Sequence, residues 1–584
     1  MSLEAYWGLG PKTRETLEAS PGTEAAIEAI EAGDVWTLVD AGVEASRATR
    51  ILRRAQSAEG MDVLATRDAR LVYKEILDLV SAHAVGREAT GRIRTLTPLT
   101  DREAIRERLD AVEAGRETWN GLSESKQAAV LDAFEAYDAA NGGQLAAAET
   151  AVALHELDVS GAAFEPVLAL DAGKLDAAAT ALDALQDGRI KAGADDELDR
   201  LRDSRVAVET LSADTTGLVE ELRSAGVRDT ADFRDGLLEY LRSETAIESA
   251  RIRDAMADDA VDATGFVDQT LRTLRAALDD AIDERVEDVA AALDESIEAA
   301  GEDVDRARTA VARVARDISL GRFADAYDLR RPTYVEGDVL AVSNARNLSL
   351  LASGVSVQPV TYALGGHSLE INAPSDHRVT VLTGANSGGK TTLLETLCQV
   401  VILAHMGLPV PAERAQVSLV DRVVFHRRHA SFNAGVLEST LQSVVPPLVS
   451  GDRTLMLVDE FEAITEPGQA ANLLHGLVRL TVEEGALGTF VTHLADDLEP
   501  LPASARTDGI FAKGLTPELA LEVDYQPRFG TVGRSTPEFI VSRLVANATD
   551  RAEAAGFRTL AEAVGMDAVQ RTLSDAEWSD TRHG

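Results

Sequence analysis

At 584 residues the chain is too long for a single hydrophobic core, so we expect about three or four domains, and a hydrophobic content of 45% allows large cores. The 98 acidic residues outnumber the 57 basic ones, which gives a formal net charge of −41, and only seven of the basic residues are lysines. This balance favours a cytosol of very high salt, where screening removes self-repulsion, over an ordinary acidic protein. The single cysteine, Cys398, excludes an intrachain disulfide. No apolar run reaches about 18 residues and no signal peptide is recognised, so we expect a cytoplasmic protein without a membrane span.

Residues 1–58 are predicted to form a small helical unit. The stretches "WGLGPKTRETL" (7–17) and "LVDAGVEASRATRIL" (38–52) each indicate a short helix, a glycine turn and a second helix. The first stretch resembles a helix-hairpin-helix, a motif that contacts the nucleic-acid backbone without reading sequence.

In that hairpin Gly8 and Gly10 would shape the turn so that N–H groups at the start of the next helix face a phosphate, and Lys12 would add charge. The alternative is an ordinary helix start with Pro11 at the first helical position, and the sequence leaves both open. Four arginines of the same unit are a candidate phosphate patch, although helical arginines usually face solvent. They are Arg47, Arg50, Arg53 and Arg54.

Residues 59–330 are almost entirely helical in pattern, without a visible repeat. The stretch 271–300 carries apolar residues at three- and four-residue steps with charges between them, which predicts long helices and a coiled arm. Near residue 331 the pattern changes to strand-like runs that alternate with helical segments such as 391–406 and 468–484. This alternation is typical of a parallel α/β sheet. The last residues, 546–584, are again mostly helical.

The stretch "TGANSGGK" (383–390) lies between a strand-like run and a helix-like one and, with Thr391, fits the phosphate-binding pattern G-x-x-x-x-G-K-[ST]. Glycines let the backbone curl so that successive N–H groups point at phosphate oxygens, and the following helix adds its positive N-terminal end. Lys390 would reach the β- and γ-phosphates of ATP, and the Thr391 hydroxyl would bind Mg²⁺. The residues expected to hold the nucleotide are Gly384, Asn386, Ser387, Gly388, Gly389, Lys390, Thr391 and Thr392.

The strand-like run "TLMLVDE" (454–460) ends in two carboxylates about 70 residues further on. Asp459 is predicted to hold Mg²⁺ together with Thr391, and Glu460 to polarise the attacking water. A third buried strand ends at His493, which is a candidate contact to the γ-phosphate, although a solvated histidine is the alternative.

Adjacent Asp and Glu without a recognisable arginine finger indicate the ABC-type plan, in which two ATPase heads enclose two nucleotides. Contacts in trans would then come from residues 426–440, with Ser431 as the hydroxyl donor to the opposite γ-phosphate.

These residues resemble the MutS family of DNA-repair ATPases, whose phosphate-binding turn reads like "TGPNMGGKST". Further similarity lies in "VPAERA" and "VDRVVF" within 404–428, in "LVDEFEAITEPGQAANLL" (457–474) and in "TFVTHLADDL" (489–498). The resemblance covers about 331–545 and extends less clearly over 60–330. It implies an α/β plus all-α fold with a helix-hairpin-helix-like unit at 1–58, a helical lever and clamp at 59–330, an ABC-type P-loop ATPase domain at 331–545 and a helical tail at 546–584. With the charge argument, it suggests a halophilic archaeal source.

The chain also departs from the family's pattern. We recognise no counterpart of the family's mismatch-reading N-terminal domain with its Phe-x-Glu wedge and expect it to be missing. The usual Gly-Arg after Asp-Glu is Glu462-Ala463, and the segment around Ser431 has a different spacing. We expect no preference for mismatches and no nuclease tail.

The resemblance implies a homodimeric, ATP- and Mg²⁺-dependent clamp on duplex or branched DNA, without sequence specificity, that acts in DNA repair or recombination. A clamp on RNA or a ribosome is the alternative, and a structural chromosome-organising ATPase is disfavoured because the coiled arm is short and interrupted. The net charge of −41 opposes DNA binding overall, so local arginine patches and closure of the arms would have to carry it.

Overall fold

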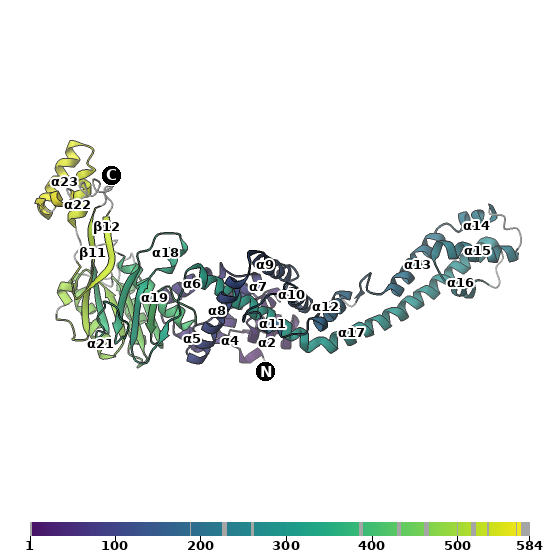
Figure 1. Cartoon of the computed structure of the whole chain (residues 1–584), viewed down its shortest axis with the longest axis horizontal. Coiled ribbons are helices and arrows are strands. Elements are labelled where there is room, and N and C mark those ends of the chain that lie inside the picture. The colour runs from purple at the N-terminus through teal and green to yellow at the C-terminus, as the bar shows by residue number, and fades with distance from the viewer. Residues whose placement is uncertain are drawn as a thin grey trace. The chain divides into compact units, whose positions relative to one another are not determined.

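The chain is mixed α/β, as the sequence predicts, and its contacts divide it into two compact units (Figure 1). The first unit comprises residues 1–131, 160–164 and 312–584, and the second comprises 132–159 and 165–311. The predicted division into four segments stays a prediction, because the segment 59–330 contributes to both units. The computed structural model describes residues 3–6, 8–186, 189–224, 230–257, 262–384, 389–428, 434–460, 467–498, 500–515, 521–533, 537–567 and 569–573.

The first unit begins with short helices around a small core of their own. Leu17, Ile30 and Leu38 are fully buried in this core, and Asp34 caps the N-terminus of one helix through its carboxylate. The elements are η1 (Leu3–Ala5), α1 (Pro11–Ala19), α2 (Thr23–Ala32), α3 (Val35–Asp40), α4 (Ala45–Gln56) and α5 (Ala58–Asp62).

Longer helices follow in the same unit, and two of them cross in direct backbone contact. The longer helices are α6 (Arg67–Ser81), α7 (Arg87–Thr95), α8 (Arg102–Gly121) and the C-terminal part of α17 (Ala263–Ala326). The crossing pair is α8 and α17. A Cβ built on Gly115 of α8 would lie 2.1 Å from the carbonyl oxygen of Asp317, and one on Gly321 of α17 would lie 2.3 Å from the backbone nitrogen of Arg116. Only glycine at both positions permits this approach.

The second unit is helical apart from a short hairpin. The predicted arm at 271–300 lies within α17, whose 64 residues correspond to a length of about 96 Å. At one end of the unit, buried leucines such as Leu237, Leu241 and Leu274 form a core between α17 and its neighbours. Besides α17, the elements are α9 (Glu124–Ala139), α10 (Gln144–Glu156), α11 (Glu165–Leu168), α12 (Ala172–Ala184), β1 (Leu185–Gln186), β2 (Arg189–Ile190), α13 (Asp196–Ser212), α14 (Thr215–Ser224), α15 (Thr230–Thr245) and α16 (Ser249–Ala255).

A six-stranded sheet forms the centre of the first unit, in the order β12-β11-β6-β10-β9-β8. Its strands are parallel except for the antiparallel pair of β11 and β12. All six residues of β6 are buried, which is why the predicted run reads as continuously apolar rather than alternating. The strands are β6 (Val379–Gly384), β8 (Arg422–His426), β9 (Thr454–Asp459), β10 (Leu487–Val491), β11 (Ala505–Leu515) and β12 (Leu521–Phe529).

Helices cover both faces of this sheet. Leu382 and Leu457 share a core with the helix α19 (Lys390–His405), whereas Val381 and Met456 share one with α20 (Ala434–Leu448) and α21 (Pro467–Glu483). A second sheet, in the order β3-β7-β4-β5, contributes to the α19 core, so α19 is enclosed on nearly all sides. Its strands are β3 (Thr333–Tyr334), β7 (Arg414–Val417), β4 (Val339–Ala345) and β5 (Val360–Gly365).

The residues before α6 extend the edge of the six-stranded sheet. The N–H of Val423 in β8 donates to the carbonyl of Val63 (2.7 Å), and the N–H of Ala65 donates to the carbonyl of Val423 (3.2 Å). The Thr66 hydroxyl donates to the carbonyl of Phe425 (2.7 Å). The helix α6 is thereby fixed to the strand that leads to residues 426–440.

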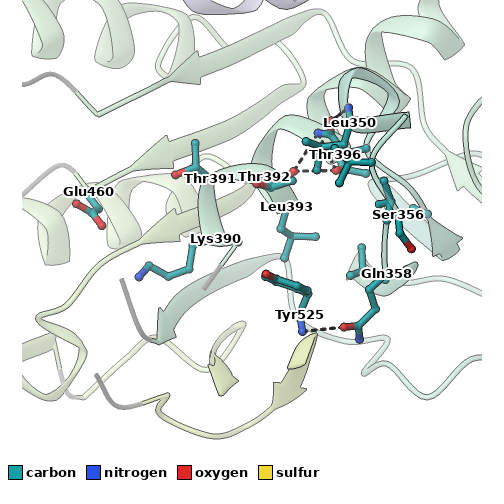
Figure 2. A pocket seen from close by; sticks show the side chains of 16 residues that line it. Leu350, Ser356, Gln358, Lys390, Thr391, Thr392, Leu393, Thr396, Glu460 and Tyr525 are labelled. Carbon is teal, nitrogen blue, oxygen red and sulfur yellow. Dashed lines mark hydrogen bonds between the residues drawn. The ribbon is translucent and has the colours of Figure 1, made fainter. Parts of the chain in front are cut away.

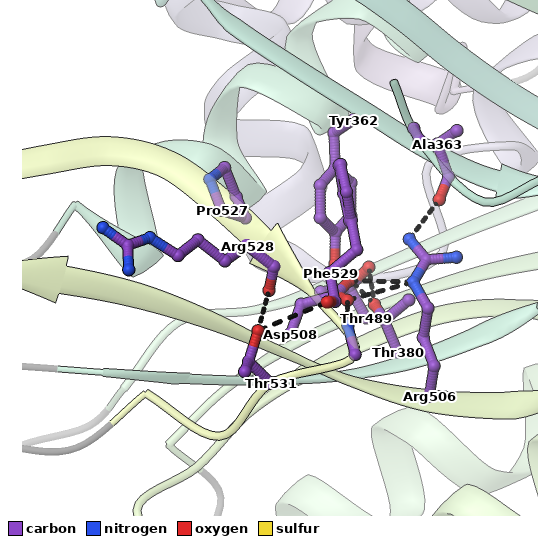
Figure 3. A network of polar contacts seen from close by, with 12 residues as sticks. Tyr362, Ala363, Thr380, Thr489, Arg506, Asp508, Pro527, Arg528, Phe529 and Thr531 are labelled. Carbon is purple, nitrogen blue, oxygen red and sulfur yellow. Dashed lines mark hydrogen bonds and ion pairs between the residues drawn. The ribbon is translucent and has the colours of Figure 1, made fainter. Parts of the chain in front are cut away.

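A buried polar network joins the two sheets below β6 (Figure 3). Arg506 and Asp508 of β11 form an ion pair of 3.0 Å with side chains 4% and 0% exposed, and the Tyr362 hydroxyl of β5 lies 2.9 Å from both Asp508 and Thr380. Thr380 in turn donates to Thr489 of β10 (2.9 Å). Burial raises the pKa of Asp508 above its usual range. Because nearly every group has a partner within the network, it fixes β5, β6, β10 and β11 relative to one another.

The described C-terminal residues form a helical hairpin. It comprises α22 (Pro537–Ala546), which contacts β11, and α23 (Arg551–Val564), and it has a small core that includes Val541 and Ala561. The remaining short helices are α18 (Leu348–Ala352) and η3 (Ala495–Leu498). No helix in the described ranges combines the length and the apolar character that a membrane crossing requires.

Candidate functional site

Two glycines bound the predicted phosphate turn, and each occupies a position that a side chain could not. Gly384 ends β6 with φ +135°, and a Cβ there would lie 2.3 Å from the carbonyl oxygen of Ile510. Gly389 is the N-cap of α19 with φ +75°, and a Cβ there would lie 2.7 Å from the Tyr525 ring. The strand, turn and helix therefore follow the predicted order. The predicted nucleotide ligands Asn386, Ser387 and Gly388 lie outside the described residues.

Lys390 and Thr391 begin α19 and line a cavity together with Glu460 (Figure 2). Lys390 is buried, and its Nζ donates to the carbonyl of Gly384 (2.8 Å), so the ammonium group lies across the base of the turn. The Thr391 hydroxyl donates to Asp459 Oδ2 (2.7 Å), which joins the two predicted Mg²⁺ ligands. Thr392, also predicted to contact nucleotide, lines the same cavity.

The donor atoms fit a magnesium-nucleotide complex. Thr391 and Asp459 offer hard oxygen ligands, which Mg²⁺ prefers, at a glycine-bounded cradle with a buried lysine. Among the described residues, no group of three or more His, Cys, Asp or Glu side chains could hold a metal by itself. This agrees with Mg²⁺ sites in which phosphate oxygens and water complete the coordination.

Glu460 follows β9 in a backbone conformation that is rare for a residue with a side chain. Its φ is +43°, and its N–H donates to the carbonyl of Val491 at the end of β10 (3.0 Å). His493 Nε2 lies 2.9 Å from Glu460 Oε1, so the structure brings the predicted base and the predicted phosphate sensor into contact. Arg428 Nη1 lies 2.6 Å from the other carboxylate oxygen, Oε2. The hydrogen bond to His493, with the charges of His493, Arg428 and Lys390, lowers the pKa of Glu460 despite its burial.

A cavity of about 370 Å³ extends from the turn to the end of the second sheet (Figure 2). This volume falls in the usual range for small-molecule sites. Its polar end carries Lys390, Thr391 and Glu460, and its opposite side includes Leu350 and Val357. Tyr525 of β12 closes the cavity beside Gly389 and is 41% exposed. Sequence reasoning missed Tyr525, because its strand pairs with β11 and only the sheet order brings it near the turn.

The predicted N-terminal hairpin places its residues at the start of α1. Gly8 has φ +86°, and Gly10 is the N-cap of α1 without a side-chain cap, followed by Pro11 at the first helical position. Lys12 is exposed. At the start of α1, Pro11 has no N–H and the N–H groups of Thr13 and Arg14 donate to the carbonyl of Gly10 (2.9 and 3.1 Å). At the second glycine turn, Glu44 caps α4 with its own carboxylate. The two glycine turns therefore differ in their capacity to bind an anion.

The candidate arginine patch on α4 is largely used within the protein. Arg47 Nη2 donates to the carbonyl of Gly8 (3.4 Å), Arg53 Nε donates to the carbonyl of Arg94 (2.8 Å), and Arg54 pairs with Asp62 (3.3 Å). Each of these guanidinium groups makes a contact within the protein and keeps further donors, so the interpretation of the group as a phosphate patch stays a prediction.

The predicted trans segment, 426–440, is described only in part. Arg427 and Arg428 follow β8, and α20 begins at Ala434. Ser431 lies outside the described residues, so its proposed contact to a partner's γ-phosphate stays a prediction.

Comparison with known proteins identifies the region that carries this geometry. Residues 380–497 match the family MutS domain V. Over 188 residues the chain is 47% identical to a DNA-binding protein MutS2 of Pyrococcus furiosus. The aligned region is 32% of this chain and 34% of the relative. Over 174 residues it is 32% identical to an endonuclease MutS2 of Thermus thermophilus, which covers 29% and 23%.

A further match is to a DNA mismatch repair protein MutS of Chlamydia trachomatis, at 31% identity over 160 residues, or 26% of this chain and 18% of the relative. The chain thus spans about a third or less of the length of each of these relatives. The comparisons support a MutS-family protein whose matched part is the family's ATPase domain.

Proposed function

We propose that the chain is an ATPase that binds DNA and couples ATP hydrolysis to the closing of a dimeric clamp in DNA repair or recombination. The hydrogen bond between Thr391 and Asp459 carries the ATPase part of this proposal. It joins a hydroxyl that lines a cavity of about 370 Å³ to a carboxylate 68 residues further along the chain.

In this proposal each side chain at the polar end has a defined task. Lys390 binds the β- and γ-phosphates of ATP, while Thr391 and Asp459 hold Mg²⁺, which offsets phosphate charge when bound. Glu460 accepts a proton from the attacking water, and His493 orients the carboxylate of Glu460 and contacts the γ-phosphate.

The apolar end of the cavity would take the base. Tyr525 presents a half-exposed ring beside Gly389, and a purine stacked on it would extend from the phosphates toward Leu350.

Assembly as a head-to-head dimer remains part of the proposal. Each nucleotide would lie between the turn of one chain and residues 426–440 of the other, with Ser431 as a candidate contact. Within one chain, Arg428 of this segment contacts Glu460. The trans contact would therefore come from the residues after Arg428.

DNA as the partner is supported by the relative from Pyrococcus furiosus, which is named a DNA-binding protein, and by the exposed Lys12 at the start of α1. A clamp on RNA or a ribosome is the second candidate. The absence of nuclease activity stays a prediction, because relatives of the matched region include proteins named endonuclease.

The decisive experiment measures ATP hydrolysis with duplex DNA, branched DNA or structured RNA added at multimolar KCl, the salt that the charge of −41 favours. Stimulation by DNA alone supports the proposal, and stimulation by RNA alone would replace DNA with RNA. A chain that hydrolyses no ATP under any of these conditions would refute the ATPase assignment.

A further inference from the structure

Arg428 has no role in the ATPase plan given above, yet it contacts the proposed catalytic base directly. Its Nη1 lies 2.6 Å from Glu460 Oε2, while His493 Nε2 lies 2.9 Å from Glu460 Oε1. Both oxygens of the carboxylate are therefore engaged. A carboxylate oxygen can accept a second hydrogen bond, but the exposed guanidinium occupies the solvent side of Oε2, from which an attacking water would approach. The departure of Arg428 would open that side of Glu460.

Arg428 is the partner that can leave without disturbing the core. Its side chain is 57% exposed, whereas that of Glu460 is 11% exposed, so the guanidinium approaches the carboxylate from the solvent side. No second carboxylate lies within ion-pair distance of Arg428 among the residues that the structure describes. Movement of Arg428 away from Glu460 would therefore leave no cavity in the protein core.

The neighbouring arginine is held firmly and fixes the backbone from which Arg428 projects. The N–H of Arg427 donates to Asp68 of α6 (2.8 Å), and its guanidinium contacts Glu395 of α19 (3.0 Å) and Glu75 of α6 (3.6 Å). The two adjacent arginines thus differ: one joins α6 to α19, and the other contacts the base.

The phosphate end of the same cavity offers Arg428 a stronger partner. Glu460 lines the cavity together with Lys390 and Thr391, so a bound γ-phosphate would lie close to the group that Arg428 contacts. A guanidinium binds phosphate oxygens through paired, charge-assisted hydrogen bonds, and a terminal phosphate carries more charge than a carboxylate. ADP lacks the γ-phosphate and offers no such exchange.

We propose that Arg428 is a cis-acting γ-phosphate sensor that leaves Glu460 for the γ-phosphate when ATP binds and returns to Glu460 in the ADP-bound and nucleotide-free chain. This inference rests on the proposed ATPase function and adds to it a residue that links the presence of the γ-phosphate to the freeing of the base. The exchange opens the solvent side of Glu460 Oε2 to water only when a substrate for hydrolysis is in place. It occurs only if the contact to phosphate is more favourable than the contact to Glu460, so it strengthens the binding of ATP and leaves that of ADP unchanged.

Equilibrium binding tests this without relying on turnover. The probes are adenylyl imidodiphosphate, which keeps a γ-phosphate and resists hydrolysis, and ADP, each with Mg²⁺ and the full-length chain. Arg428→Gln should weaken binding of the imidodiphosphate roughly fivefold or more and leave ADP binding unchanged. Arg428→Lys, which keeps the charge but not the paired hydrogen bonds, should restore part of the loss.

The control is Arg453→Gln, which removes an arginine that is 47% exposed and pairs with Asp421, a residue that does not line the cavity; it should change neither affinity. Equal losses for both nucleotides with Arg428→Gln would show a structural role and overturn the proposal. Unchanged affinity for both would overturn it as well. A failure of the proposed ATPase function would give a different result, because neither nucleotide would then bind the unaltered chain.

A double-mutant cycle sharpens the test. Glu460→Gln removes the charge that Arg428 must leave, so it should tighten binding of the imidodiphosphate in the unaltered chain and should tighten it less in the Arg428→Gln background. Equal effects of Glu460→Gln in both backgrounds would show that the two residues act independently and would refute the exchange.

Steady-state kinetics supply a second readout. Arg428→Gln should lower kcat and raise KM for ATP, because the variant lacks both the contact to the γ-phosphate and the charge beside it. A higher kcat would instead identify Arg428 as a simple inhibitor that leaves into solvent, and the sensor would be refuted.

Discussion

Two glycine turns of this chain have the same local chemistry in different surroundings. Each precedes a helix and a lysine: Gly389 and Lys390 at α19, and Gly10 and Lys12 at α1. Lys390 is 5% exposed at the edge of a buried parallel sheet, whereas Lys12 lies on the surface. An ammonium group and helix N–H groups act far more strongly on a phosphate where water and salt are excluded. The first turn is therefore suited to a tight nucleotide site, and the second to weak, salt-sensitive contact with a nucleic-acid backbone.

We expect the largest effect when the positive charge of Lys390 at the buried turn is removed. Lys390→Ala should weaken ATP binding by at least about 100-fold, because it removes the buried ammonium group that would bind both the β- and the γ-phosphate. Equilibrium nucleotide binding measures the loss, and circular dichroism should show an unchanged fold. Native affinity in this variant would contradict the assignment of the turn.

The second prediction separates nucleotide binding from ATP hydrolysis at the same site. Glu460→Gln keeps the size of the side chain but cannot accept the proton, so hydrolysis should slow by roughly 10²- to 10⁴-fold while ATP binding survives. Light scattering with ATP and Mg²⁺ should then detect an accumulated dimer, and with ADP a looser pair. Full hydrolysis would remove Glu460 from the role of base, whereas an ATP-bound monomer would exclude the shared-site dimer.

At the exposed turn the expected effect is smaller and depends on salt. Lys12→Gln should weaken DNA binding a few-fold and reduce the slope of log affinity against log salt by about 1, as for the loss of one phosphate contact. The matched control is Lys513→Gln, a half-exposed lysine that pairs with Glu522. A titration across KCl concentrations measures both. Identical salt slopes for the two variants would show that the start of α1 is an ordinary helix start without a phosphate contact.

For the last prediction, we expect that a mismatch in the DNA does not change the binding affinity. A hairpin that contacts only the backbone carries no information about base pairing, so homoduplex and single-mismatch duplex should bind alike. Competition binding with the two duplexes tests this expectation. A tenfold preference for the mismatch, about 1.4 kcal/mol, would show that another part of the chain reads the bases.

Much of the buried site follows from the sequence, and the exposed site does not. Strand-like runs that end in Gly384, Asp459 and His493 predict a shared edge, because parallel strands end together, and the structure brings Asp459 to Thr391 and His493 to Glu460. The halophilic source, the roles of the site residues and the dimer remain predictions.

The remaining features depend on contacts between distant segments. Tyr525 reaches the cavity only through the pairing of β12 with β11, and Arg428 meets Glu460 only because β8 lies beside β9. The arginines of α4 look like a surface patch in sequence, whereas Arg53 and Arg54 are bound to groups outside their own helix. Neither periodicity nor motif spacing specifies such partners, since these depend on the order of strands and the packing of helices.

The position of β6 in its sheet has a consequence for the order of events during synthesis. β6 ends at Gly384, but its neighbours on both sides are made later: β10 ends at Val491 and β11 at Leu515. The network below β6 likewise needs Thr489 and Asp508. While the chain is still growing on the ribosome, the phosphate turn is translated more than 100 residues before the strands that hold it. The strands on both sides of β6 are therefore complete only after Leu515 has been translated, and we expect a nucleotide site that depends on them to form no earlier.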